Sequence, residues 1–151
     1  MSDITLSVVV PAFNEEARIL HCIDELTSYL HASGVTWELI VADDGSADRT
    51  AVLVASVAAR EPRITLIRGD HAGKGAAVRR GMMAARGTWC LMADADLSMP
   101  PHNIDRFFDA VAGTSSCAQI AIGSREAPGS RRVNEPWPRH LVGTPARCLW
   151  R

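Results

Sequence analysis

The chain has 151 residues, of which 47% are hydrophobic, and this is enough to bury the core of one soluble domain. Sixteen Lys and Arg residues against 17 Asp and Glu residues give a formal net charge of -1, so no general basic field exists that would hold nucleic acid. Any phosphate-bearing partner must therefore be bound locally, and we expect no nucleic-acid partner.

Targeting signals and cysteine usage set the expected compartment. The first residues carry no basic segment followed by an apolar stretch, and the chain has no run of 18 apolar residues, so we expect neither a signal peptide nor a membrane span. The four cysteines are widely separated and form no CxxC pair. This usage is typical of reduced thiols, and it predicts a cytoplasmic location without a zinc site.

Hydrophobic periodicity predicts alternating strands and helices. Residues 6–10 form a short β-branched run that Pro11 ends, which is typical of a buried parallel strand. Helical spacing follows, with Asn14 as the expected cap, Glu15 and Glu16 in the first turn and Gly34 as the end. The later pattern predicts strands at 37–42, 64–67, 88–93 and 119–123, and helices at 47–60, 73–86 and 101–111.

This alternation predicts the fold class. We expect an α/β fold with a Rossmann-like three-layer α/β/α sandwich, a mostly parallel sheet and a single domain over residues 1–151. Ligands of such folds bind at the carboxyl ends of the strands, and every polar cluster described below follows a predicted strand. The loop after the first strand lacks GxGxxG, which argues against a dinucleotide site.

An acid pair follows the fourth predicted strand. Asp94 and Asp96 are separated by Ala95, so an extended backbone would direct both carboxylates to one side, about 6 to 7 Å apart. Two such oxygen ligands suit Mg²⁺ or Mn²⁺, whose remaining ligands would be water and the phosphate oxygens of a nucleoside diphosphate. The alternative is that both acids are merely solvent-exposed residues of a surface loop.

Two further acids, Asp43 and Asp44, close the second predicted strand. Gly45 and Ser46 permit a tight turn there, and a carboxylate at this position can accept hydrogen bonds from a ribose or a base edge. Capping of the next helix would explain only one of the two acids.

Lys74 lies between two glycines at the predicted start of the third helix. The spacing from Gly69 is one residue short of a Walker loop, and Gly75 replaces the required Ser or Thr, so we reject that motif. Lys74 and the backbone N–H groups could still meet an anion, although a flexible surface loop is an equal alternative.

Four arginines follow the fifth predicted strand, namely Arg125, Arg131, Arg132 and Arg139. A phosphate-bearing acceptor would suit them, whereas the alternative of a solvated loop fits Arg131 and Arg132 better. We interpret His21, His31 and His71 as surface residues.

Four motifs carry a family resemblance through their order and spacing. They are VVPAFNEE at 9–16, VADDGS at 41–46, GKG at 73–75 and DAD at 94–96. In this order they resemble glycosyltransferase family 2, which has the GT-A fold. The run GKGAAVRRG at 73–81 and the later GSR at 123–125 are most similar to dolichyl-phosphate β-glucosyltransferases and their polyprenyl-phosphate relatives, with the mannosyl-transferring enzymes close behind.

This resemblance implies roles for individual residues. Asp94 and Asp96 would hold the metal on the donor diphosphate, together with Ser98. Arg125 and Arg139 would meet the acceptor phosphate or that diphosphate. A donor-binding role is implied for a larger set, namely Pro11, Ala12, Phe13, Glu15, Asp43, Asp44, Lys74, Asp94 and Ala95.

The implied reaction is transfer of a hexose from UDP-glucose or GDP-mannose with inversion, with Mg²⁺ or Mn²⁺ as the cofactor. Asp96, Lys74 and Arg125 are its candidate catalytic residues, because metal and cationic groups would stabilise the departing diphosphate. A polyprenyl or dolichyl phosphate acceptor is already anionic and needs no general base, and we nominate none. Such an acceptor implies peripheral contact with the cytoplasmic face of a membrane.

The similar enzymes continue well past the region of resemblance, which ends near Gly143. The expectation is therefore a GT-A domain that is incomplete at the C-terminus, with donor binding more secure than turnover. Two alternatives remain open: a non-catalytic nucleotide-sugar-binding module, and a nucleotidyltransferase. The acidic loop at 11–16 argues against the second, which would need a basic glycine-rich loop there.

Overall fold

The structure is a computed structural model that describes residues 4–112. The chain divides into two compact units, Met1–Ile104 and Asp105–Arg151, and the fold described below is that of the first. Its elements are β1 (Leu6–Ala12), α1 (Ile19–Ala32), β2 (Trp37–Asp43), α2 (Thr50–Ala58), β3 (Ile64–Arg68), α3 (Lys74–Ala84), β4 (Trp89–Met92) and the 3₁₀ helix η1 (Pro101–Asn103). Helix α4 (Ile104–Ala112) leads into the second unit.

The four strands form one parallel sheet in the order β3-β2-β1-β4. The two central strands, β1 and β2, are buried along their whole length, and β1 pairs with β2 from Leu6↔Trp37 to Ala12↔Asp43. The edge strands β3 and β4 of this described sheet are only partly buried. The two central strands are therefore the ones that are covered on both faces, as is expected for a parallel sheet between helices.

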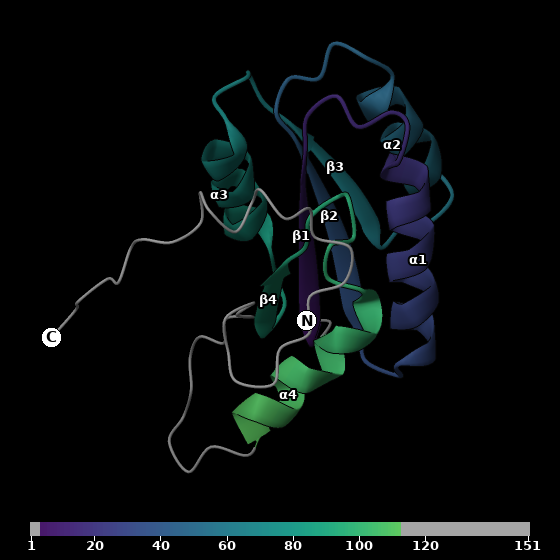
Figure 1. Ribbon diagram of the computed structural model, residues 1–151, viewed down its shortest axis with the longest axis vertical. Coiled ribbons are helices and arrows are strands. Elements are labelled where there is room, and N and C mark those ends of the chain that lie inside the picture. Colours follow the sequence, from purple (N-terminus) through teal and green to yellow (C-terminus); the bar gives the residue numbers. More distant parts are fainter. Residues whose placement is uncertain (1–3, 113–151) are drawn as a thin grey trace, which may run out of the picture. The chain divides into compact units, whose positions relative to one another are not determined.

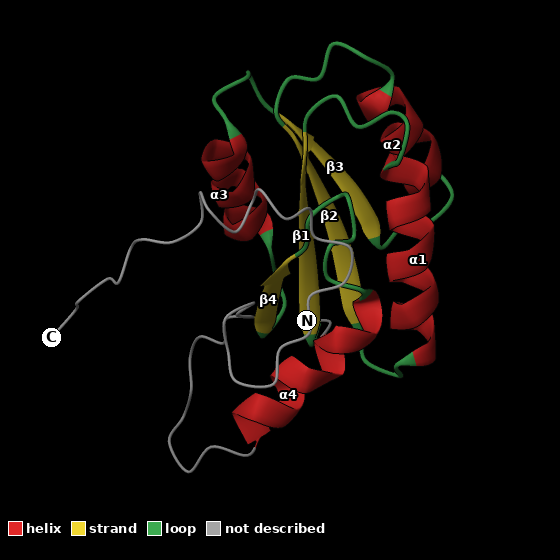
Figure 2. Cartoon of the chain, viewed as in Figure 1, coloured by secondary structure: helices red, strands yellow, loops and turns green. Residues whose placement is uncertain are grey.

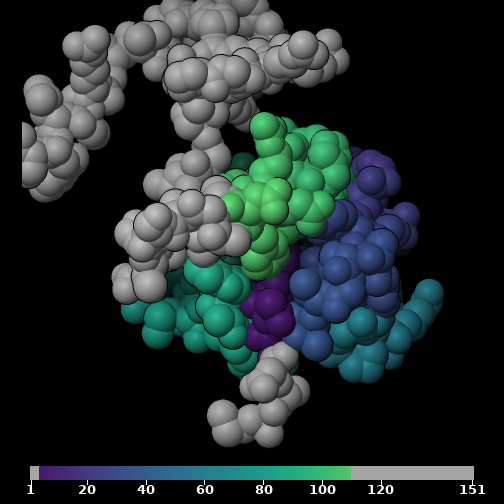
Figure 3. Space-filling model, turned by 90° about the horizontal axis from the view of Figure 1, so that it is seen from below, coloured from purple at the N-terminus to yellow at the C-terminus, as the bar shows by residue number. Residues whose placement is uncertain are grey.

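Helices cover both faces of the sheet. α3 packs against β1 and β2 on one face, whereas α2 packs against β2 and β3 on the other and also contacts α1 (Figures 1 and 2). The view from below looks onto the amino ends of the strands, where the start of β1 (purple) lies between the blue segments and the teal segments (Figure 3). These observations confirm the predicted three-layer sandwich with a parallel sheet.

The strand order reverses direction next to β1. The chain first adds β2 and β3 on one side of β1 and then returns to place β4 on the other side. In open parallel sheets a crevice forms at such a point, outside the carboxyl ends of the two strands that flank it. The loops after β1 and β4 are therefore the expected walls of a ligand site.

Glycine allows α3 to lie close to the sheet. A Cβ atom at Gly81 would lie 2.3 Å from Cγ1 of Val9 and 3.4 Å from Cβ of Ala42. Val9 is completely buried in β1, so its methyl group has no room to move. This packing fixes α3, and with it Lys74, relative to β1.

The predicted start of the first helix is wrong. Asn14 has a positive φ of 54° and its side chain accepts a hydrogen bond from the N–H of Ala47, so it does not cap α1, which begins at Ile19. The backbone N–H groups of Asn14, Glu15 and Glu16 donate instead to side chains of the turn after β2, namely Ser46, Thr50 and Asp48. Partners more than 30 residues away thus replace the local helical turn.

The other boundaries differ by up to three residues from those predicted. α2 is shorter than the expected helix at 47–60, and β4 ends at Met92. The strand expected at 119–123 lies outside the described residues. No helix in the described part of the chain is long and apolar enough to cross a membrane.

Candidate functional site

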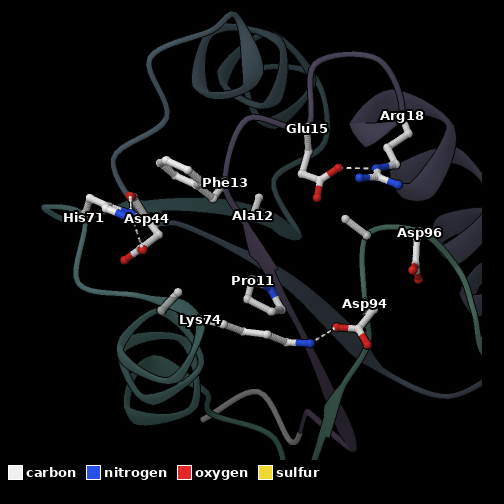
Figure 4. A pocket seen from close by; sticks show the side chains of 12 residues that line it. Pro11, Ala12, Phe13, Glu15, Arg18, Asp44, His71, Lys74, Asp94 and Asp96 are labelled. Carbon is white, nitrogen blue, oxygen red and sulfur yellow. Dashed lines mark hydrogen bonds and ion pairs between the residues drawn. The ribbon is translucent and has the colours of Figure 1, made fainter. Parts of the chain in front are cut away.

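A pocket of about 340 Å³ opens at the carboxyl ends of β1 and β4, where the strand order reverses. Its walls come from the loop after β1, the turn after β2, the start of α3 and the loop after β4 (Figure 4). The lining residues are Pro11, Ala12, Phe13, Glu15, Arg18, Asp44, His71, Lys74, Ala77, Asp94, Ala95 and Asp96. Residues from all four sequence motifs thus meet in one cavity.

The turn after β2 is held by Asp44, which is only 2% exposed. Its carboxylate accepts hydrogen bonds from the N–H groups of Ala72 and Gly73 and from the guanidinium of Arg80, and it contacts Nδ1 of His71 at 2.8 Å. Burial raises the pKa of Asp44, but these hydrogen bonds outweigh burial and bring its pKa to about 2. Asp44 is therefore ionised at neutral pH and anchors the loop that leads into α3.

The neighbouring acid, Asp43, does not line the pocket. Its side chain is completely buried, and its carboxylate accepts the N–H of Ser46 and contacts Nε of Arg68 at 3.3 Å. Adjacent residues at a strand end project to opposite sides, so only one of the two acids can face the cavity. The donor-binding role expected for Asp43 stays a prediction.

Glycine at position 45 makes the turn beside these acids possible. Its φ is +76°, and a Cβ atom there would lie 2.9 Å from the backbone nitrogen of His71 and 3.2 Å from the carbonyl oxygen of Gly69. The turn after β2 and the loop after β3 therefore touch backbone to backbone. This contact places His71 at the pocket.

The loop after β4 forms a turn and does not extend the strand as predicted. The N–H of Leu97 donates to the carbonyl of Asp94, and Leu97 has a positive φ of 52°. Asp94 and Asp96 both line the pocket nonetheless. The N–H of Ser98 donates to Asp96 at 2.9 Å, and the hydrogen bonds from Ser98 lower the pKa of Asp96. Ser98 thus supports Asp96 and does not itself line the cavity.

Lys74 is the first residue of α3, and its side chain reaches across the pocket. Its Nζ atom lies 2.5 Å from Oδ1 of Asp94 (Figure 4). Both side chains remain accessible, at 59% and 41% exposure. On the other side of the acid pair, Arg18 pairs with Glu15. Each of the two permanent cations of the lining therefore pairs with a carboxylate that also lines the pocket.

Three pocket residues, Arg18, His71 and Ala77, are missed by the sequence interpretation. His71, interpreted as a surface residue, lines the pocket and stacks on Phe13 with ring centroids 4.1 Å apart. Arg18 carries no sequence signal, because its importance depends on where α1 begins. For His71 the only available signal is its place two residues before Gly73 in the motif at 73–75.

The pocket can accept a divalent cation together with an anion. Four carboxylates line it, from Glu15, Asp44, Asp94 and Asp96, against two permanent cations, Arg18 and Lys74. An anionic ligand would be repelled by this balance unless a cation came with it. Asp94 and Asp96 supply the oxygen atoms that Mg²⁺ and Mn²⁺ prefer. Among the described residues no group of three or more His, Cys, Asp or Glu could hold a metal, so water and ligand oxygens would complete the shell.

The predicted basic cluster cannot be placed. Arg125 and Arg139, the candidates for the acceptor phosphate, lie outside the described residues, as do Arg131 and Arg132. The described pocket therefore contains none of the residues predicted to meet the acceptor phosphate.

Comparison with known proteins decides the family. The model of "Glycosyl transferase family 2" matches residues 7–148. The chain belongs to glycosyltransferase family 2. This result confirms the predicted family and favours glycosyl transfer over nucleotidyl transfer as the chemistry of the fold.

Curated relatives include glycosyltransferases whose names contain dolichyl phosphate or dolichol phosphate. A dolichyl-phosphate beta-glucosyltransferase of Trichomonas vaginalis is 36% identical over 94% of this chain and 45% of its own length. The mouse protein of that name is 44% identical over 80% of this chain and 40% of its own length. A dolichol-phosphate mannosyltransferase of Pyrococcus furiosus is 32% identical over 97% and 40%. The chain thus spans less than half the length of these relatives.

Two solved structures share the fold. The mannosyltransferase PcManGT of Pyrobaculum calidifontis, in complex with GDP-Man and Mn²⁺, matches with a TM-score of 0.61 and 24% identity, over 74% of this chain and 33% of its own. Glucosyl-3-phosphoglycerate synthase of Mycobacterium tuberculosis, in complex with Mn²⁺, UDP and glucosyl-3-phosphoglycerate, matches with a TM-score of 0.55 and 29% identity, over 72% and 39%. These likenesses confirm the predicted GT-A fold.

Proposed function

We propose that this family 2 glycosyltransferase chain binds a nucleoside-diphosphate hexose, UDP-glucose or GDP-mannose, with Mg²⁺ or Mn²⁺ on the diphosphate. The observation that carries the proposal is the division of one pocket into two ends. Phe13 and His71 offer stacked rings at one end, and Asp94 and Asp96 offer carboxylates at the other (Figure 4). A nucleoside suits the first end, and a metal-bound diphosphate suits the second.

The relatives support the wider reaction. Curated relatives are named dolichyl-phosphate glucosyltransferases and a dolichol-phosphate mannosyltransferase. We therefore extend the proposal to transfer of the hexose to a polyprenyl or dolichyl phosphate by the whole protein. A lipid-linked acceptor implies peripheral contact with the cytoplasmic face of a membrane.

The proposed chemistry is a single displacement with inversion at the anomeric carbon. An oxygen of the acceptor phosphate forms the new bond to that carbon, while the bond from the carbon to the donor diphosphate breaks and its electron pair leaves with the nucleoside diphosphate. A divalent cation, when bound, supplies positive charge for the departing diphosphate. Asp94 and Asp96 would hold that cation, and the ammonium of Lys74, which pairs with Asp94, is a permanent cation of the same pocket.

Titration calorimetry tests the donor site. We expect UDP-glucose or GDP-mannose to bind in the presence of Mn²⁺ and to lose that binding in the Asp94→Asn, Asp96→Asn double variant. The matched control is Asp24→Asn, Glu25→Gln, which removes two exposed carboxylates from α1, away from the pocket lining. Equal binding by both double variants would overturn the proposal.

A further inference from the structure

Lys74 already forms an ion pair with Asp94, one of the two carboxylates that the proposed metal would use. Its ammonium lies 2.5 Å from Oδ1 of Asp94, across the pocket from the helix to which it belongs (Figure 4). A divalent cation bound to Asp94 and Asp96 would therefore lie close to the positive charge of Lys74 and be repelled by it. Lys74 and the metal would therefore compete for the same carboxylate.

Neighbouring cations have other partners. Arg18 pairs with Glu15, and Arg80 donates to the carboxylate of Asp44 and to the carbonyl of Asp43. The side chain of Arg80 also packs closely against Gly69, because a Cβ atom at Gly69 would lie 2.3 Å from its guanidinium carbon. Among the described lining residues, Lys74 is thus the cation that pairs with Asp94, whereas the charge of Arg18 acts on Asp96.

The surroundings leave Lys74 free to change partner. Its side chain is 59% exposed, and its partner Asp94 is 41% exposed, so the ion pair is weak and exchangeable. The two flanking glycines, Gly73 and Gly75, have open space where a side chain would project. A lysine has a flexible stem and a compact charge, and it can therefore turn from a carboxylate to a nearby phosphate without movement of the helix.

We propose that Lys74 is an exchangeable counter-ion that makes metal binding depend on the nucleotide. Without ligand it neutralises Asp94 and weakens the site for a divalent cation. With the diphosphate present it leaves Asp94, pairs with phosphate oxygens and leaves both carboxylates to the metal. The inference rests on the proposed donor site. It adds that Lys74 weakens the binding of the metal alone but strengthens the binding of the nucleotide together with the metal.

The test measures Mn²⁺ and UDP affinities separately. Free Mn²⁺ is followed by electron paramagnetic resonance without nucleotide, and UDP binding is followed by calorimetry at saturating Mn²⁺. For Lys74→Met we expect Mn²⁺ without nucleotide to bind about 3- to 10-fold more tightly, and UDP with Mn²⁺ to bind at least about 3-fold more weakly. The matched control, Arg79→Met, removes an exposed cation of the same helix that does not line the pocket, and we expect less than about a 2-fold change in both affinities.

A conservative variant separates charge from structure. Lys74→Arg keeps the positive charge, so we expect its Mn²⁺ affinity without nucleotide to return to the wild-type value. Far-ultraviolet circular dichroism and the urea midpoint show whether each variant is folded. Equal tightening in Lys74→Met and Lys74→Arg would overturn the counter-ion role.

The outcomes distinguish this inference from the proposed function. If wild-type protein binds UDP with Mn²⁺ but Lys74→Met does not tighten Mn²⁺ binding without nucleotide, the counter-ion role is wrong and the donor site stands. If Lys74→Met tightens Mn²⁺ binding but leaves UDP binding unchanged, Lys74 does not move to the diphosphate. If wild-type protein binds neither ligand, both proposals are wrong.

Discussion

The close approach of α3 to β1 can be tested at two glycines of one helix. Gly81 faces Val9, and a Cβ atom there would lie 2.3 Å from a methyl carbon, whereas a Cβ atom at Gly75 meets nothing within 4 Å. Alanine is favoured over glycine in a helix interior by about 1 kcal/mol. Overpacking a well-filled core costs about 1 to 3 kcal/mol. The two positions should therefore respond to alanine with opposite signs.

The balance at Gly81 depends on Val9. This valine is fully buried and β-branched, so it cannot rotate away from an added methyl group. We expect Gly81→Ala to lower the free energy of unfolding by up to about 2 kcal/mol after the helical gain is subtracted. Gly75→Ala should raise it by about 0.5 kcal/mol, less than in a helix interior because the residue lies in the first turn.

Urea unfolding followed by circular dichroism measures both changes. The midpoint should fall for Gly81→Ala and rise slightly for Gly75→Ala, with the same slope for both. Adding Val9→Ala should remove most of the cost of Gly81→Ala, which gives a coupling energy of about 1 kcal/mol or more. A Gly81→Ala variant as stable as Gly75→Ala would refute the close packing that positions Lys74.

Three further predictions concern buried acids and the stacked rings. Glu38→Gln should lower the free energy of unfolding by about 1 to 3 kcal/mol at pH 7, because the buried Glu38 carboxylate accepts from the Ser7 hydroxyl and from Arg86. Burial raises the pKa of Glu38, but these hydrogen bonds lower it overall. Wild-type protein should therefore lose this contribution to stability as the pH falls below about 4.5. The variant has no such contribution to lose, and urea unfolding at several pH values measures the difference. Asp44→Asn should speed hydrogen exchange at Ala72 and Gly73, whose N–H groups it holds, and unchanged protection there would contradict its anchoring role. His71→Ala should weaken UDP binding about 3- to 10-fold in calorimetry, since it removes the ring stacked on Phe13, and wild-type affinity would exclude His71 from the nucleoside end.

Local sequence was sufficient for the core of this site because each motif follows a strand. Buried runs such as residues 6–10 predicted the strands, and the carboxyl ends of parallel strands always share one edge. That rule places Lys74 and Asp94 at one edge of the sheet, whereas only the family resemblance implied a donor-binding role for Phe13. The start of α1 was wrong because Asn14 bonds to the turn after β2, and no local pattern contains a partner 33 residues away.

What the sequence by itself determined is the fold class, the family and the edge of the sheet at which polar residues gather, since these depend on short-range periodicity and on motif order. Only the tertiary structure decided which side chain at that edge faces the cavity. In the folded chain Asp44 lines the cavity, whereas Asp43 is buried away from it. His71 stacks on Phe13, and Lys74 pairs with Asp94. These choices depend on backbone turns and on contacts between distant segments, and such contacts exist only once the chain has folded.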